Sequence, residues 1–199
     1  MSAVRHEKRR RDILTRALDV FVEEGFENAT FQKIADRCGI TRTTLYIYFR
    51  NKKEVFNYSL KLFLATLEEE IMQIQADKSL GSIEKITAVL LSVFAQVEEN
   101  GRLLSVILDY LVHLSKGKSD IGKRVRRRTI RLRHILASLV IAGIEAGELR
   151  RVSVKTANDF LYALIEGAIL RRVVLRQESL GELRKTAAFA IRQFAAEAR

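Results

Sequence analysis

Residues 30–52 read TFQKIADRCGITRTTLYIYFRNK, and this stretch decides the fold of the N-terminal part of the chain. Its apolar residues recur at the spacing of two short helices: Phe31, Ile34, Ala35, Leu45 and Phe49. Thr30 and Thr41 precede the two patterns as natural N-caps, and Gly39 permits the turn between them. Two helices joined in this way describe a helix-turn-helix, whose second helix enters the DNA major groove.

The second helix leaves polar side chains facing outward, and these are the candidate DNA contacts. Arg42 in its first turn suits two hydrogen bonds to guanine, with a phosphate contact as the alternative. Thr43 suits a thymine methyl or a phosphate. Tyr46 and Tyr48 suit phosphate contacts, with aromatic contact with a base as a second option and buried packing as the alternative for Tyr46. Contacts that position the DNA backbone are expected from Thr30, Thr41, Thr44 and Lys52.

A basic run precedes this motif at the start of a helix predicted over residues 7–24. It comprises Arg5, Lys8, Arg9, Arg10 and Arg11. Positive charge at a helix N-terminus opposes the helix dipole, so the helix itself gains nothing from it. We expect phosphate contacts, above all from Arg9 and Arg10; a solvated tail is the alternative.

The composition predicts an all-α chain. The 199 residues contain no proline, whereas average usage would give about ten. Proline ends helices, and no sustained alternation typical of strands is present. Long apolar stripes of helical period predict about nine helices in total. One helix, over residues 52–74, is long enough to leave a small domain and enter a larger one, which places a domain boundary near Leu60.

The net charge of +11 favours a polyanionic partner, and nucleic acid is the commonest one. A solvated basic surface and an anionic membrane are the alternatives. The longest apolar run, residues 135–144, is half of a membrane span. No signal peptide is evident, so we expect a cytoplasmic protein without a membrane partner. Cys38 is the single cysteine, and we expect it to pack in the core.

The N-terminal motif resembles the DNA-binding signature of TetR-type transcriptional regulators. The matching elements are T-x-x-x-I-A at residues 30–35, G-I-T at 39–41 and L-Y-x-Y-F-x-N-K at 45–52. Thr43 departs from the family pattern, which often has glycine, alanine or proline there. The resemblance implies a helix-turn-helix domain over residues 1–59 and a larger helical ligand-binding and dimerisation domain over residues 60–199.

The resemblance also implies a homodimer, a double-stranded DNA operator and a small-molecule effector. The last two helices would form the dimer interface through Ala163, Gly167, Ala168, Ala187, Ala188 and Ile191. The ligand candidates on the central helices are Phe94, Leu108, Tyr110, His113, Phe160, Tyr162 and Glu166, with ordinary core packing as their alternative. An apolar lining favours a small hydrophobic effector, and an acidic one is the other option.

A second basic cluster lies between residues 116 and 133, where Asp120 is the single acid. Its members are Lys116, Lys118, Lys123, Arg124, Arg126, Arg127, Arg128, Arg131 and Arg133. Pairing with acids of the larger domain, Glu68 among them, is one interpretation. A flanking DNA contact and recognition of an acidic ligand such as an acyl-CoA are the others.

No catalytic, cofactor or metal motif is present, because the three histidines are scattered and no phosphate-binding glycine loop occurs. The sequence therefore predicts a sequence-specific transcriptional regulator, most simply a repressor that its effector releases from a palindromic operator. A ligand-independent nucleic-acid-binding protein of the same fold, such as a chromosome-occlusion factor, is the alternative.

Overall fold

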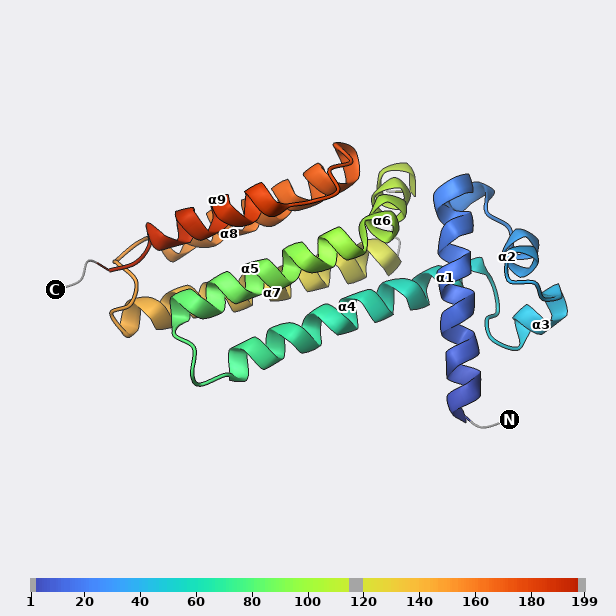
Figure 1. Cartoon of the computed structure of the whole chain (residues 1–199), viewed down its shortest axis with the longest axis horizontal. Helices are drawn as coiled ribbons and strands as arrows, with labels where there is room; N and C mark the ends of the chain where they lie inside the picture. Colours follow the sequence, from blue (N-terminus) through green and yellow to red (C-terminus); the bar gives the residue numbers. More distant parts are fainter. Residues whose placement is uncertain (1–2, 115–119, 197–199) are drawn as a thin grey trace. The chain divides into compact units, whose positions relative to one another are not determined.

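A computed structural model describes residues 3–114 and 120–196, and helices joined by short loops make up most of this part of the chain (Figure 1). It contains nine α-helices and one π-helical turn, and no strand, so the all-α prediction is confirmed. The elements are α1 Ala3–Asn28, α2 Phe31–Arg37, α3 Arg42–Tyr46, α4 Lys52–Ala76, α5 Ser82–Glu99, α6 Gly101–Leu114, α7 Asp120–Glu145, α8 Val154–Ile169, η1 Leu170–Val174 and α9 Gly181–Arg192.

The helices form two compact units. The head comprises Met1–Leu64 and Arg102–Gly122, and the body comprises Ala65–Gly101 and Lys123–Arg199. The head therefore includes most of α6, which lies far from the helix-turn-helix in the sequence. These units reflect compactness rather than function, so the functional division between residues 59 and 60 stays a prediction.

An aromatic cluster forms the core of the head around the end of α1. Gly25 takes a φ of 74°, which interrupts the helix and turns Phe26 back onto it. The Phe26 ring lies 5.6 Å from Phe21, 5.1 Å from Phe56 and 4.8 Å from Tyr110. Because these side chains come from α1, α4 and α6, the cluster fixes all three helices in one core.

The body is built around α5, which packs against α8 and α9 (Figure 1). Fully buried side chains such as Leu90, Phe94 and Leu161 form its core. Helix α9 ends at Arg192, and residues 194–196 then pair with the segment after α7. There the Arg150 amide donates to the Phe194 carbonyl at 3.0 Å, and Leu149 bridges Ala195.

No helix among those the structure describes is both long and apolar enough to cross a lipid bilayer.

Glu98 joins the end of α5 to the start of α9. Its carboxylate accepts hydrogen bonds from the Leu180 amide and from both terminal nitrogens of Arg184. Burial alone would raise the pKa of Glu98, but the bonds from Arg184 and the Leu180 amide favour the ionised form. The pKa of Glu98 is therefore held below its usual range.

Replacing Glu98 by glutamine should lower the free energy of unfolding by about 2 kcal/mol at neutral pH, because Arg184 loses a charged partner. A depressed pKa stabilises the fold fully above the ordinary carboxyl pKa of about 4.3 and ceases to do so as pH falls through the folded value. The difference between wild type and Glu98→Gln should therefore shrink as acid is added. Urea titrations at several pH values measure it, with the exposed neighbour variant Glu99→Gln as control. An equal effect of both substitutions would contradict this role.

Candidate nucleic-acid interface

The helix-turn-helix forms as its capping residues predict. The Lys33 amide donates to the Thr30 hydroxyl at 3.1 Å, and the Thr44 amide donates to the Thr41 hydroxyl at 3.1 Å. Each threonine therefore satisfies a backbone donor that a helix start would leave open. Both predicted N-caps are confirmed.

Helix α3, which the sequence predicts to be the recognition helix, is short, and buried side chains hold one of its sides against the core of the head. Leu45 is fully buried and Phe49, just after the helix, is 1% exposed. Gly39 takes a φ of 63° in the turn before α3, a conformation that favours glycine. Cys38 beside it is buried, which confirms its packing role, and burial raises the pKa of its thiol. The opposite face of α3 is thereby held outward.

That outward face carries Arg42, Thr43 and Tyr46, all exposed. The Arg42 guanidinium donates to the Tyr46 hydroxyl at 3.1 Å, and the Tyr46 ring packs 4.9 Å from Phe31. These contacts restrict the rotamers of the two side chains before any ligand binds, which lowers the entropy lost on binding.

Ile47 follows directly after α3 and is 67% exposed, and sequence reasoning did not single it out. Its aliphatic side chain suits a thymine methyl group in the major groove. Tyr48 is half-buried, with its ring stacked 4.7 Å from the His6 ring of α1. Exposure of a large apolar side chain beside the reading helix is a signal that only the structure supplies.

Arg10 packs against aromatic side chains of the head, and its phosphate contact stays a prediction. Its guanidinium lies 4.0 Å from the centre of the Tyr58 ring and 4.9 Å from that of Phe49. Such cation–π packing stabilises the head. Arg9 is half-buried, whereas Arg5 and Lys8 on the same helix are exposed.

Lys52 has a structural role at the end of α1, and its phosphate contact stays a prediction. Its ammonium group donates to the carbonyls of Phe26, Glu27 and Ala29 at 2.8, 2.7 and 2.9 Å. An ammonium group has three donors, and all three are used here. Lys52 therefore caps the C-terminal turn of α1 and ties it to the start of α4.

The predicted ligand residues are divided between the head and the body. Leu108 and Tyr110 belong to the head, where Tyr110 is held by the aromatic cluster. The other side chains lie in the body, except His113, whose side chain falls outside the part that the structure describes. Phe94 is fully buried core, Tyr162 is half-buried, and Phe160 and Glu166 are exposed. Phe94 and Tyr110 are thus packed in cores, and the ligand roles of all seven residues stay predictions.

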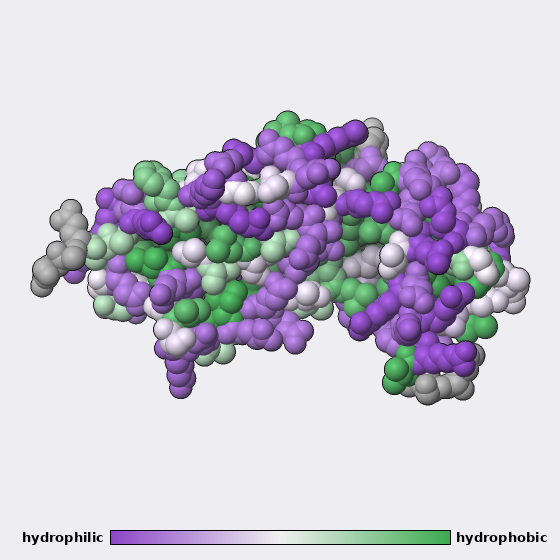
Figure 2. Space-filling view, viewed as in Figure 1, coloured by the Kyte–Doolittle hydropathy of each residue, from purple (hydrophilic) through white to green (hydrophobic). Residues whose placement is uncertain are grey.

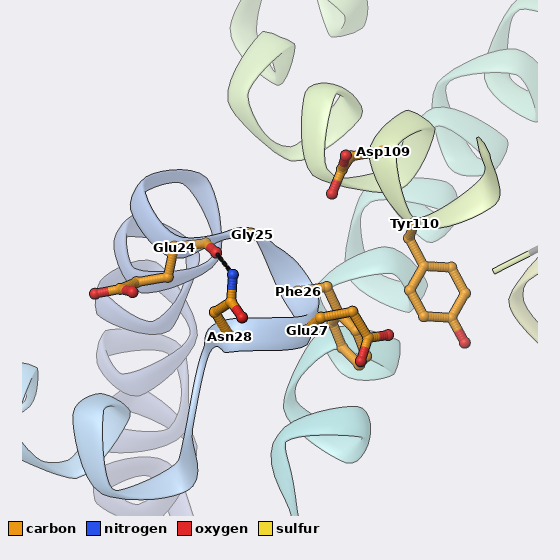
Figure 3. A pocket seen from close by; sticks show the side chains of 7 residues that line it. All are labelled: Glu24, Gly25, Phe26, Glu27, Asn28, Asp109 and Tyr110. Atoms are coloured by element: carbon orange, nitrogen blue, oxygen red, sulfur yellow. Dashed lines mark hydrogen bonds between the residues drawn. The ribbon is translucent and has the colours of Figure 1, made fainter. Parts of the chain in front are cut away.

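A pocket of about 300 Å³ lies within the head, where residues of the α1 turn face α6 (Figure 3). Its lining residues are Glu24, Gly25, Phe26, Glu27, Asn28, Asp109 and Tyr110. Glu24 is paired with Lys33 at 2.7 Å, and its backbone carbonyl accepts a bond from Asn28. The carboxylates of Glu24, Glu27 and Asp109 give the lining an acidic character, although Lys33 pairs with Glu24.

Three residues predicted for the dimer interface are core residues of the protomer. Ala168, Ala187 and Ile191 are at most 1% exposed because they pack inside the body. Ala163 is exposed and Gly167 borders open space, so these two remain candidates; Ala188 is half-buried. The small residues thus serve mainly the contacts of α8 and α9 within one chain.

Large apolar side chains are instead exposed on the last helices. We call this set of side chains the C-terminal apolar face. Its members and exposed fractions are Phe160 38%, Leu170 52%, Val174 60%, Leu175 58% and Phe189 68%. Figure 2 shows hydrophobic atoms among hydrophilic ones at the upper edge of the body, where α8, η1 and α9 lie. Exposed large apolar side chains on these helices are candidates for a protein–protein contact.

Part of the second basic cluster is neutralised by acids of the body. Glu68 of α4 accepts hydrogen bonds from Arg128 and Arg131, and Asp159 of α8 accepts one from Arg133. Pairing with acids of the larger domain was one of the alternatives that the sequence left open, and it holds for Arg128, Arg131 and Arg133. Lys116 and Lys118 lie outside the described residues.

Comparison with known proteins shows to which family this chain belongs. A model of the bacterial regulatory proteins of the TetR family matches residues 13–58, which include the whole helix-turn-helix. A model of the C-terminal domain of BetI-type transcriptional repressors matches residues 82–196. The chain belongs to the TetR family. This TetR-family protein is a DNA-binding transcriptional regulator, and the family comprises regulators rather than enzymes.

Individual relatives cover most of the chain. The fatty acid metabolism regulator protein of Bacillus subtilis (strain 168) is 23% identical over 171 residues, covering 83% of this chain and 84% of the relative. A TetR transcription regulator from Haloarcula marismortui ATCC 43049 is 20% identical with a TM-score of 0.77, covering 95% and 99%. AibR in complex with isovaleryl coenzyme A and operator DNA is 15% identical with a TM-score of 0.69, covering 92% and 96%. The two solved structures share the fold.

Proposed function

We propose that this TetR-family protein is a repressor that binds a palindromic operator as a homodimer and leaves it when a small-molecule effector binds. The single observation that carries the proposal is the outward face of α3, where Arg42, Thr43 and Tyr46 stand exposed on the buried anchors Leu45 and Phe49. Exposed hydrogen-bonding groups on a rigidly anchored helix are what major-groove reading requires.

The contacts divide into two kinds. Arg42, Thr43, Tyr46 and Ile47 read base edges, because they lie at the exposed side of α3 or directly after it. Contacts that position the DNA backbone come from Thr30, Thr41, Thr44, Tyr48 and Arg9. Lys52 and Arg10 act indirectly, by holding α1 against α4 and the recognition unit. A role at a bacterial DNA operator supports a cytoplasmic location.

We propose that two subunits contact each other through the C-terminal apolar face. Ala163 and Gly167 of α8 are proposed to belong to the same interface. A twofold dimer uses the same patch on both subunits, so each apolar side chain is buried twice. Two subunits then present two recognition helices to the two half-sites of a palindrome.

Phe189→Glu should split the dimer. Burying an unpaired charge at such a position costs about 2 kcal/mol per subunit, and the two copies together raise the dimer dissociation constant roughly a thousandfold. Sedimentation velocity over a concentration series measures this. The control is Met72→Glu on α4, where a side chain of 49% exposure is replaced by the same charge. If both variants stay dimeric, the C-terminal apolar face is not the interface.

The effector is proposed to be an acyl-CoA, which combines the apolar and acidic properties expected of the ligand. Two relatives support this class: one is named a regulator of fatty acid metabolism, and another was solved with isovaleryl coenzyme A and operator DNA. The acidic pocket of the head is unsuited to its phosphates, so the site is proposed to lie in the body.

Selection of bound duplexes from random DNA, followed by acyl-CoA titration of the selected complex, tests the proposal. An enriched palindrome that is released by acyl-CoA supports it. A palindrome that no acyl-CoA or free fatty acid releases would favour the ligand-independent alternative, and no enriched sequence would overturn sequence-specific binding.

A further inference from the structure

Four cations on α7 remain without a partner after the body's acids are assigned. Lys123, Arg124, Arg126 and Arg127 are exposed and make no ion pair or hydrogen bond with any residue that the structure describes. Arg128 and Arg131, one turn further along, are held by Glu68. We call the four unpaired residues the α7 basic face.

The four side chains project from one side of the helix. Successive residues turn by about 100°, which places residues 123, 124, 126 and 127 within roughly half of the circumference. The opposite side carries Val125 and Leu132, both half-buried. Like charges three and four residues apart repel each other on a helix. Repulsion within the α7 basic face therefore destabilises the helix, and a bound anion would remove this repulsion.

The shape of this face selects an extended anion. Small-molecule sites are concave and bury most of their ligand, whereas these four side chains stand exposed on the outside of a helix. The cations span about 6 Å along the helix axis. Duplex DNA carries one negative charge per about 1.7 Å of its axis, so the same length of DNA offers three to four phosphates.

We propose that the α7 basic face binds the phosphodiester backbone of duplex DNA, as a second and sequence-independent contact outside the helix-turn-helix. The inference rests on the proposed function in one respect: the proposed DNA binding identifies the polyanion as duplex DNA. It adds affinity and salt dependence without adding base readout, because phosphate contacts carry no sequence information.

The test compares two fourfold glutamine variants that lose the same charge. One replaces Lys123, Arg124, Arg126 and Arg127, and the other replaces the exposed body residues Lys78, Arg150, Arg151 and Lys155. Fluorescence anisotropy measures their binding to a random-sequence duplex of about four helical turns (about 40 base pairs) over a salt series. Circular dichroism confirms folding, and the double variant Arg126→Gln/Arg127→Gln replaces the fourfold one if that fails to fold.

Loss of two to four phosphate contacts should lower the slope of log affinity against log salt by about 2–4, since each contact contributes about 0.9. The body control should keep the wild-type slope. Equal slopes for the two variants would overturn the proposal, as would a basic-face variant that loses only its response to an acyl-CoA. A separate measurement tests the proposed function. If that function is wrong, Arg42→Ala should prefer the selected operator over the random duplex as strongly as wild type does.

Discussion

Replacing Arg42 by alanine should weaken operator binding more than any other single change on the surface of the head. A bidentate arginine–guanine contact is worth about 1–3 kcal/mol of discrimination, and a dimer loses it in both half-sites. The expected loss is therefore about 2–6 kcal/mol, roughly 30-fold to more than ten-thousandfold in affinity. The fold should be unaffected, because Arg42 is exposed and its one hydrogen bond goes to the Tyr46 hydroxyl.

The measurement is anisotropy with the selected operator and with a duplex in which the guanine of each half-site is changed. Wild type should distinguish the two duplexes and Arg42→Ala should bind them equally. Arg151→Ala, an exposed arginine of the body, serves as control and should behave as wild type. If Arg42→Ala weakens binding to both duplexes by the same factor, Arg42 contacts a phosphate instead.

Lys52→Met should be the most destabilising exchange of a charged residue in the head. Methionine keeps the length of the side chain but removes three hydrogen bonds to the carbonyls at the end of α1. Charged hydrogen bonds contribute about 1.5–3 kcal/mol each when isolated, and water replaces part of them at this half-buried position. We expect the free energy of unfolding to fall by about 2–4 kcal/mol.

Urea denaturation followed by circular dichroism measures this loss, and the adjacent exposed residue gives the control Lys53→Met. Arginine at position 52 should restore only part of the stability, because its planar guanidinium cannot reach three carbonyls with the geometry of an ammonium group. If folded Lys52→Met shows a reduced salt dependence of DNA binding and normal stability, the phosphate role predicted from the sequence is the right one.

The sequence was sufficient for features that depend on local chemistry. Thr30 and Thr41 were recognisable as caps because a threonine hydroxyl at a helix start has one natural partner, the amide three residues on. Helical periodicity likewise separated the buried Leu45 and Phe49 from the exposed side of α3. Such features involve neighbours within a turn or two, which the linear sequence displays directly.

Features that depend on distant partners were not recoverable. We predicted phosphate contacts for Lys52 and Arg10 because basic side chains near a helix-turn-helix commonly bind the DNA backbone. Their partners, the end of α1 and the Tyr58 ring, become visible only once the chain is folded. The small residues of α8 and α9 carried a similar ambiguity, since Ala168 and Ala187 suit a contact within one chain as well as one between chains.

The central claim is that α3 reads a palindrome, and a paired affinity measurement tests it most directly. Wild-type protein is titrated with the selected operator and with the same duplex carrying both half-sites scrambled, at several salt concentrations. The account predicts that both affinities fall with salt while the operator stays about a thousandfold or more tighter, the ratio typical of specific DNA recognition. Equal affinity for the two duplexes at every salt concentration would contradict it.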